Sequence, residues 1–198
     1  MDFPVSCRAE VRDPFQRAVA VLHSFGYEEA RRAFEALAEQ DPGCGMAAWG
    51  VAMTYWHPLW AQPTSEELAR GAAAAARAAS MGAGTERERA YVGAIGAFYR
   101  GADRIDHRTR ALAYRDAMEK LAADFPGDHE ARILHALAIL GSAAPGDGLA
   151  GAARAARVAG EADKAVTYYR SLVDLAGSSS SRGRVLAEAR DYLARTGG

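Results

Sequence analysis

The sequence predicts an all-α fold of stacked antiparallel helical pairs, with a last helix that caps the C-terminal end. Three observations support this fold class. Alternating β-branched residues of the kind found in strands are missing, while alanine is abundant. Helix-capping signals recur along the chain. Short turn-forming stretches divide the 198 residues into segments of helical length, which is enough chain for one domain or a short repeat array.

The first two helices are marked by proline and glycine. We expect the first helix to begin near Pro14, because Asp13 is a favourable N-cap residue and proline is favoured at the first helical position. This helix should end before the turn at residues 24–26. The second helix should cover residues 27–40 and stop before the Asp-Pro-Gly sequence at 41–43.

Two capping boxes mark the helices that follow residue 60. Thr64 is followed three residues later by Glu67, and Thr85 is followed in the same way by Glu88. In a capping box the threonine side chain and the glutamate side chain each satisfy a backbone N–H at the start of the helix. The sequence therefore predicts helices that begin directly after Thr64 and Thr85.

The remaining helices are bounded by turns rich in glycine, proline and serine. The expected ranges are 45–56, a helix after the turn at 101–106 that ends near 124, and then 128–140, 149–158, 161–175 and 182–194. The loop at 141–148, with the sequence GSAAPGDG, is the clearest break in the chain. We therefore expect N-terminal helical pairs in residues 1–140, a junction at 141–148, and a C-terminal pair with its capping helix in 149–198, all in one continuous array.

Composition excludes several classes of protein. The 24 lysines and arginines are balanced by 25 aspartates and glutamates, so the basic footprint of a nucleic-acid-binding protein is missing. No uninterrupted apolar stretch is long enough to span a membrane, and the first residues lack the basic start and apolar run of a secretory signal. Cys7 and Cys44 form no metal-type pair, so we expect reduced thiols in a cytoplasmic protein.

Small, aromatic and proline residues recur with the spacing of a known repeat. The positions that carry this pattern are Ala30, Phe34, Pro42, Gly160, Ala165, Tyr169 and Leu172. Through them the chain resembles the tetratricopeptide-repeat family over residues 14–57 and 149–176. The stretches HSFGYEEA, WGVAM and HPLW are also similar to the opening of longer bacterial repeat proteins of this kind, of which this chain resembles a shortened form.

The resemblance implies a right-handed solenoid in which the first helix of each pair lines a concave groove. Its leading functional implication is a non-catalytic scaffold that binds a peptide or protein partner in this groove. The residues expected to contact the partner are Met46, Trp49, Met53, Trp56, His57, Trp60 and Tyr91.

The stretch from Trp49 to Trp60 holds all three tryptophans and allows two interpretations. Aromatic residues at helical spacing are typical of a core, and this interpretation is favoured for Trp49 and Tyr55. Trp56, His57 and Trp60 lie at the end of a helix that Pro58 terminates, so for them a place on the surface or in the groove is equally reasonable.

An alternative function is a small-molecule or metal-binding protein, with or without enzymatic activity, that uses the aromatic and histidine residues of 23–60. His23 and His57 are one repeat length of 34 residues apart, so they should lie on neighbouring helices and could share a metal ion. The competing interpretation is that each histidine caps the end of its own helix. Phosphate-binding loops and nucleophile motifs are missing from the sequence, so we assign neither a catalytic residue nor a cofactor.

Overall fold

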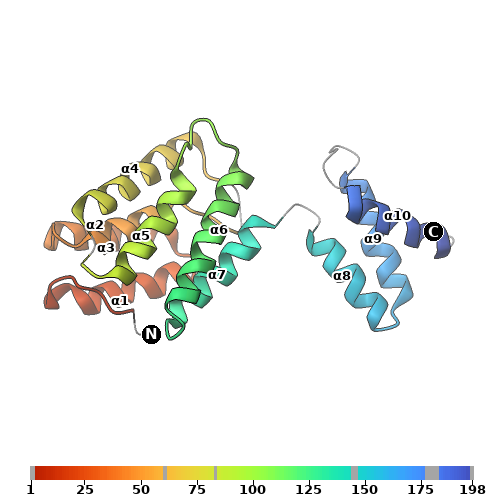
Figure 1. Ribbon diagram of the computed structural model, residues 1–198, viewed down its shortest axis with the longest axis horizontal. Coiled ribbons are helices and arrows are strands. Elements are labelled where there is room, and N and C mark those ends of the chain that lie inside the picture. The colour runs from red at the N-terminus through yellow and green to blue at the C-terminus, as the bar shows by residue number, and fades with distance from the viewer. Residues whose placement is uncertain (1–2, 60–61, 83, 144–146, 177–182, 197–198) are drawn as a thin grey trace. The chain divides into compact units, whose positions relative to one another are not determined.

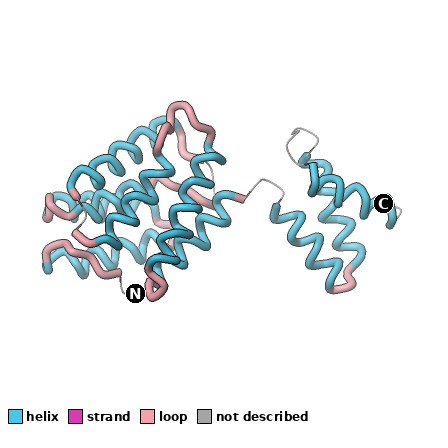
Figure 2. Tube along the Cα trace, in the orientation of Figure 1, coloured by secondary structure: helices cyan, strands magenta, loops and turns pink. Residues whose placement is uncertain are grey.

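The computed structural model describes residues 3–59, 62–82, 84–143, 147–176 and 183–196. The structure is 77% helical, and the described ranges contain no strand, so the predicted all-α class is confirmed (Figures 1 and 2). The chain divides into two compact units, Met1–Ser142 and Ala143–Gly198. None of the described helices is both long and apolar enough to cross a lipid bilayer.

Among the described residues, the first unit contains seven helices and the second contains three. The helices of the first unit are α1 (Ala9–His23), α2 (Tyr27–Gln40), α3 (Gly45–Met53), α4 (Ser65–Met81), α5 (Glu86–Tyr99), α6 (His107–Asp124) and α7 (His129–Ser142). Those of the second unit are α8 (Asp147–Val158), α9 (Ala162–Ala176) and α10 (Gly183–Thr196). Within each unit, every helix packs against the next one along the chain, which gives the neighbouring pairs of a repeat-like helical stack.

Helix α3 is the centre of the first unit. It packs against α2 and α4, and also against α1 and α5, and every residue of α3 except Val51 is buried. Close approach of the helices depends on glycine. A Cβ atom at Gly50 would lie 2.3 Å from Cδ1 of Phe34 on α2, and a Cβ atom at Gly71 of α4 would lie 2.3 Å from Cζ of Tyr99 on α5. Any larger residue would therefore push these helices apart.

The predicted helix starts are confirmed for α4 and α5 but not for α1. Both capping boxes form, with the Thr64 side chain accepting from the Glu67 amide and the Thr85 side chain from the Glu88 amide. Helix α1 begins at Ala9, not near Pro14, which lies inside the helix. The additional turn buries Val11, which is 1% exposed, so core packing outweighs the proline start signal.

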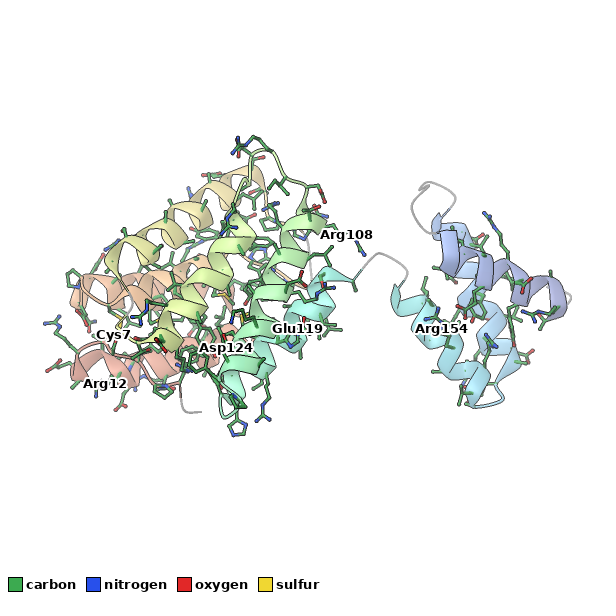
Figure 3. The ribbon with its side chains drawn as sticks, in the orientation of Figure 1. Cys7, Arg12, Arg108, Glu119, Asp124 and Arg154 are labelled. Atoms are coloured by element: carbon green, nitrogen blue, oxygen red, sulfur yellow. A yellow bond between two sulfur atoms is a disulfide. The ribbon has the colours of Figure 1, made fainter. Side chains whose placement is uncertain are left out.

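The second unit has its own core. Its buried residues are Ala150, Ala153, Tyr169, Leu172, Leu186 and Ala189. Helix α10 packs on α9, as expected of a capping helix. Arg154 of α8 (Figure 3) and Tyr169 both hold the carboxylate of Glu188 on α10, and these hydrogen bonds lower the pKa of Glu188 to about 2. The continuous array expected for residues 1–198 stays a prediction, because each unit is compact by itself.

Candidate functional site

Most of the residues expected to line an open groove are buried. Met46, Trp49, Met53 and Tyr91 are each 1% exposed. The interpretation of Trp49 as a core residue is therefore confirmed. The cover over Trp49 and Tyr91 comes from the chain itself, because residues 3–8, which we call the N-terminal strap, lie against α1, α3 and α5 before α1 begins.

Phe3 anchors the strap in the aromatic core. Its side chain is 0% exposed, and its ring centroid lies 5.6 Å from that of Phe15, 5.3 Å from that of Trp49 and 5.0 Å from that of Tyr91. The guanidinium carbon of Arg87 lies 4.5 Å from the centroid of the Phe3 ring, in a cation–π contact. Phe3 therefore fills a pocket formed by three helices, in the manner of an anchor residue at an interface.

Side chains hold the main chain at the start of the strap. The Gln16 side chain of α1 accepts from the Phe3 N–H over 2.9 Å and donates to the Phe3 carbonyl over 2.7 Å. Nη1 of Arg87 on α5 donates to the Pro4 carbonyl over 2.9 Å. Contacts to main-chain atoms are independent of the side chain at that position, so they fix an extended segment without reading its sequence.

Glu88 binds the middle of the strap. Its carboxylate accepts from the Ser6 N–H over 2.6 Å and from the Ser6 hydroxyl over 2.7 Å, while the same side chain completes the capping box with Thr85. Glu88 is 1% exposed. Burial raises the pKa of Glu88, but the hydrogen bonds from Ser6 and Thr85 outweigh burial and leave this pKa below its ordinary value.

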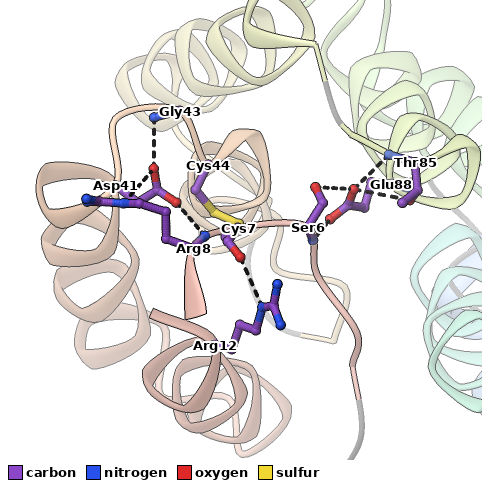
Figure 4. The surroundings of a disulfide bond; sticks show 9 residues. All are labelled: Ser6, Cys7, Arg8, Arg12, Asp41, Gly43, Cys44, Thr85 and Glu88. Carbon is purple, nitrogen blue, oxygen red and sulfur yellow. Dashed lines mark hydrogen bonds and ion pairs between the residues drawn. A yellow bond between two sulfur atoms is a disulfide. The ribbon is translucent and has the colours of Figure 1, made fainter. Parts of the chain in front are cut away.

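A disulfide closes the end of the strap. Cys7 is bonded to Cys44 at the start of α3, so the expectation of reduced thiols is wrong, and the cytoplasmic location loses the argument on which it rested (Figure 4). On either side of the bond, the Arg8 N–H donates to the Asp41 carboxylate over 2.9 Å, and Nε of Arg12 donates to the Cys7 carbonyl over 3.0 Å. The disulfide forms because the turn before α3 lies beside the strap, a proximity that a separation of 37 residues does not reveal.

The strap is also linked to α7 through α5. Nε of Arg87 lies 2.6 Å from Oδ2 of Asp128, which also accepts from the Tyr91 hydroxyl over 2.8 Å. Asp128 in turn accepts from the amide of Ala131 at the start of α7. Burial raises the pKa of Asp128, but the bonds from Arg87 and Tyr91 leave this pKa below its ordinary value. Arg87 thus joins the strap, α5 and α7 in one network.

The hydrogen bonds of the strap stabilise it by about as much free energy as the ordering of its backbone costs. Six hydrogen bonds between side chains and the main chain of the strap, at about 1–2 kcal/mol each, stabilise it by roughly 6–12 kcal/mol. Ordering the backbone of six residues costs about 1–2 kcal/mol per residue, which is the same range. Burial of the Phe3 side chain adds about 2–3 kcal/mol. Phe3 and the disulfide therefore decide whether the strap stays in place.

The remaining predicted site residues have other surroundings. Trp56 is 3% exposed and packs edge-on against Tyr114 with 4.5 Å between ring centroids, so of the two interpretations left open for Trp56 the structure supports packing in the core. The helix was expected to reach Trp56 but ends at Met53. Residues 54–56 follow in turns, in which each backbone N–H donates to the carbonyl three residues earlier. Trp60 lies outside the described residues.

Each histidine of the expected metal pair has a protein partner. Nε2 of His57 lies 3.1 Å from the Thr54 carbonyl oxygen, as the helix-capping interpretation predicts. Nε2 of His23 lies 2.7 Å from the carboxylate of Glu130 on α7. Among the described residues, Cys7, Asp41 and Cys44 are the one group of at least three potential metal ligands that lie close together, and the two sulfur atoms of this group are already bonded to one another.

Helix α7 lies beside the C-terminal ends of α1 and α3. The small cavity at this contact, of about 20 Å³, is lined by Leu22, His23, Phe25, Tyr27, Met53, Trp56, Pro58, Leu134 and Leu137. A volume of this size holds a water molecule at most. The cavity beside His23 is therefore too small to hold the small-molecule ligand that the alternative function requires.

Comparison with known proteins adds no further assignment. No protein-family model, curated protein or solved structure matches the chain. The resemblance to tetratricopeptide repeats, and to longer bacterial proteins of that type, therefore stays a prediction.

The strap and the contacts that hold it were not predicted from the sequence. The signals were present but local: an aromatic residue before proline at Phe3-Pro4, and a second cysteine in the turn before a helix. The residue preceding proline is biased toward extended backbone, so an extended segment could have been expected there. Gln16 and Arg87 could not have been singled out, because residues of those types are common on any helix. Glu88 was predicted only as a capping-box residue, because its contact with Ser6 joins groups 82 residues apart.

Proposed function

We propose that the first unit is a helical scaffold with a site for an extended peptide on α1, α3 and α5, and that the chain's own strap fills this site. The observation that carries the proposal is the way the strap is bound. Side chains of neighbouring elements hold its main chain at six points, and one aromatic residue enters a pocket. Bound peptides are recognised by this same combination of main-chain hydrogen bonds and one buried anchor.

The arrangement also indicates which peptide the site would accept. Phe3 is fully buried, whereas Pro4, Ser6 and Arg8 have exposed side chains. A partner therefore needs an aromatic residue at the position of Phe3 and an extended main chain after it. The exposed side chains of Ser6 and Arg8 also contact the carboxylates of Glu88 and Asp41, so a partner gains affinity from a hydroxyl group and a positive charge at these positions.

A titration tests the proposal. The full-length chain with Phe3→Ala and Cys7→Ser should hold its strap weakly, because both deciding contacts are removed. A fluorescent peptide with the sequence of residues 1–10, with serine at the cysteine position, should bind this variant saturably, as measured by fluorescence anisotropy. The tethered strap of the unchanged chain has an effective concentration of the order of millimolar, so the same peptide should fail to bind there.

A second peptide with alanine in place of phenylalanine serves as the control ligand. It retains every main-chain contact and lacks only the anchor, so its affinity should be at least tenfold lower, as about 2 kcal/mol of lost burial requires. If both peptides bind equally, or neither binds a variant whose helicity is intact by circular dichroism, the strap is a structural segment and the proposal fails.

A further inference from the structure

Apart from its peptide bond to α1, the strap has one covalent link to the described part of the surface that it covers. Cys7 lies near its end, and Cys44 precedes the first residue of α3, the helix that carries Trp49. The noncovalent contacts at this end are polar: the Arg8 N–H and guanidinium both face the Asp41 carboxylate. The Arg8 side chain is exposed, so water can replace its contact with Asp41, and these contacts hold the end of the strap less firmly than the covalent bond does.

We propose that the Cys7–Cys44 disulfide is a redox latch on the peptide site. In the oxidised protein the strap occupies the site. Reduction of the disulfide by a dithiol releases the strap, and the site becomes open to an extended peptide with an aromatic residue at the position of Phe3. This inference rests on the proposed function for the identity of the incoming ligand, but the release of the strap stands independently of it.

The chemistry is a thiol–disulfide exchange that balances without any other reactant. A thiolate of the dithiol attacks one sulfur of the Cys7–Cys44 bond, which breaks and leaves the other sulfur as a thiolate. The second thiol of the reductant then displaces the first cysteine and closes the reductant into a cyclic disulfide. Two electrons pass to the protein, and the two sulfurs take up the two protons that the dithiol gives up.

Access to the bond is controlled by the strap itself. Cys7 is 5% exposed and Cys44 is 2% exposed, so a reductant reaches the sulfurs when the strap lifts. Phe3 holds the opposite end of the same segment in its aromatic pocket. Loss of the Phe3 ring should therefore speed the reduction. A disulfide that is buried independently of the strap would be reduced at the same rate with or without that ring.

The occupancy of the site can be measured directly. The N–H groups of Phe3, Ser6 and Arg8 each donate to a side chain of the site, so their hydrogen exchange reports whether the strap is bound. Exchange is measured by nuclear magnetic resonance on the full-length protein, oxidised and after treatment with a dithiol. A Cys7→Ser, Cys44→Ser variant provides the same comparison without reductant. The peptide of residues 1–10 with serine at the cysteine position is added as the binding probe.

The latch predicts that these three amides exchange about tenfold faster or more in the reduced protein and in the double serine variant, while amides in α3 and α5 keep their protection. It also predicts that oxidised Phe3→Ala is reduced severalfold faster than the unchanged protein, as followed by thiol labelling and mass spectrometry. The probe should also bind saturably to reduced Phe3→Ala, whose own tethered strap lacks the anchor, and should fail to bind oxidised Phe3→Ala.

The other outcomes separate the two proposals. If the strap amides lose protection but the probe does not bind, the latch stands and the peptide-binding function fails. If protection of these amides is unchanged by reduction, or if the probe binds the oxidised and reduced proteins equally, the latch is overturned. A loss of protection throughout α3 and α5 would also overturn it, because the disulfide would then maintain the whole unit instead of the strap.

Discussion

A single aromatic side chain, Phe3, fills the pocket between α1, α3 and α5 in the first unit. Its ring contacts residues from α1, α3 and α5, three helices that are far apart in sequence, and replaces the solvent that an open groove would contain. Truncation of Phe3 would leave a hole lined by Trp49 and Tyr91, which are themselves 1% exposed. The local stability of this region thus depends on a residue outside any helix.

Phe3→Ala should lower the free energy of unfolding by about 3 kcal/mol, the lower end of the range for a buried aromatic residue, because the strap can shift to narrow the cavity. Denaturant unfolding measures this change. Ile133→Ala on α7 is the matched control: the Ile133 side chain is 46% exposed, and its truncation should change the free energy by less than about 0.5 kcal/mol. Equal effects of the two substitutions would contradict the placement of Phe3.

Glu88 should make the strap sensitive to acid. Its pKa is lower in the folded protein than the ordinary value of 4.5, so its ionised form stabilises the fold fully above pH 4.5. This stabilisation is lost as the pH falls through the lower, folded-state pKa. The exchange rate of the Ser6 amide should therefore rise on acidification below pH 4.5, after correction for intrinsic exchange. In Glu88→Gln this additional acid dependence should disappear, and its persistence would contradict the role assigned to the carboxylate.

The packing of whole helices depends on where small residues lie. Gly71 allows α4 to approach Tyr99 of α5, whose hydroxyl donates to the Ala52 carbonyl of α3 over 2.8 Å. Gly93 of α5, in contrast, faces open space. Both glycines lie inside helices, where alanine is intrinsically favoured by up to about 1 kcal/mol. Packing alone therefore determines which of the two positions requires glycine.

Gly71→Ala should destabilise the protein by about 1–3 kcal/mol, because the added methyl group displaces the Tyr99 ring and its hydrogen bond. Gly93→Ala should leave stability unchanged or raise it by up to about 1 kcal/mol. Thermal or denaturant unfolding of the two variants provides a comparison in which the chemical change is identical. A stabilising effect at position 71 would show that α4 and α5 are not in close contact there.

The helices were largely predictable from local signals, but the site was not. The capping boxes at Thr64 and Thr85 depend on residues three apart, so the sequence alone identifies them. The start of α1 was misplaced because burial of Val11 is a tertiary effect. The strap was even less predictable, because its contacts join residues such as Ser6 and Glu88 that are 82 positions apart. Only the folded chain brings those groups together.

At the scale of the whole molecule, the chain has two cores with no residue in common. The larger is built from residues between Phe3 and Ala138, and the smaller from residues between Ala150 and Ala189. A unit that buries its own apolar surface should fold without the other. The second unit is short enough that its own core gives it only marginal stability.

A fragment ending at Ser142 should therefore be helical, contain the Cys7–Cys44 disulfide and unfold cooperatively. A fragment of residues 143–198 should show a lower midpoint in thermal unfolding followed by circular dichroism. If the longer fragment is unfolded while the full chain is folded, the division into two compact units does not describe how the chain gains its stability.

The claim that the strap fills a peptide site is tested most directly by trapping a peptide on Cys44. In the Cys7→Ser variant Cys44 is left without its partner, and a peptide of residues 1–10 that carries an activated cysteine at position 7 should form a mixed disulfide with it. A peptide that docks in the strap's position brings the two sulfurs together, so the account predicts that it reacts roughly 30-fold faster or more than the same peptide with alanine at position 3, as the loss of about 2–3 kcal/mol of burial requires. Equal trapping rates for the two peptides would mean that Cys44 reacts without any docking, and would contradict the existence of a peptide site.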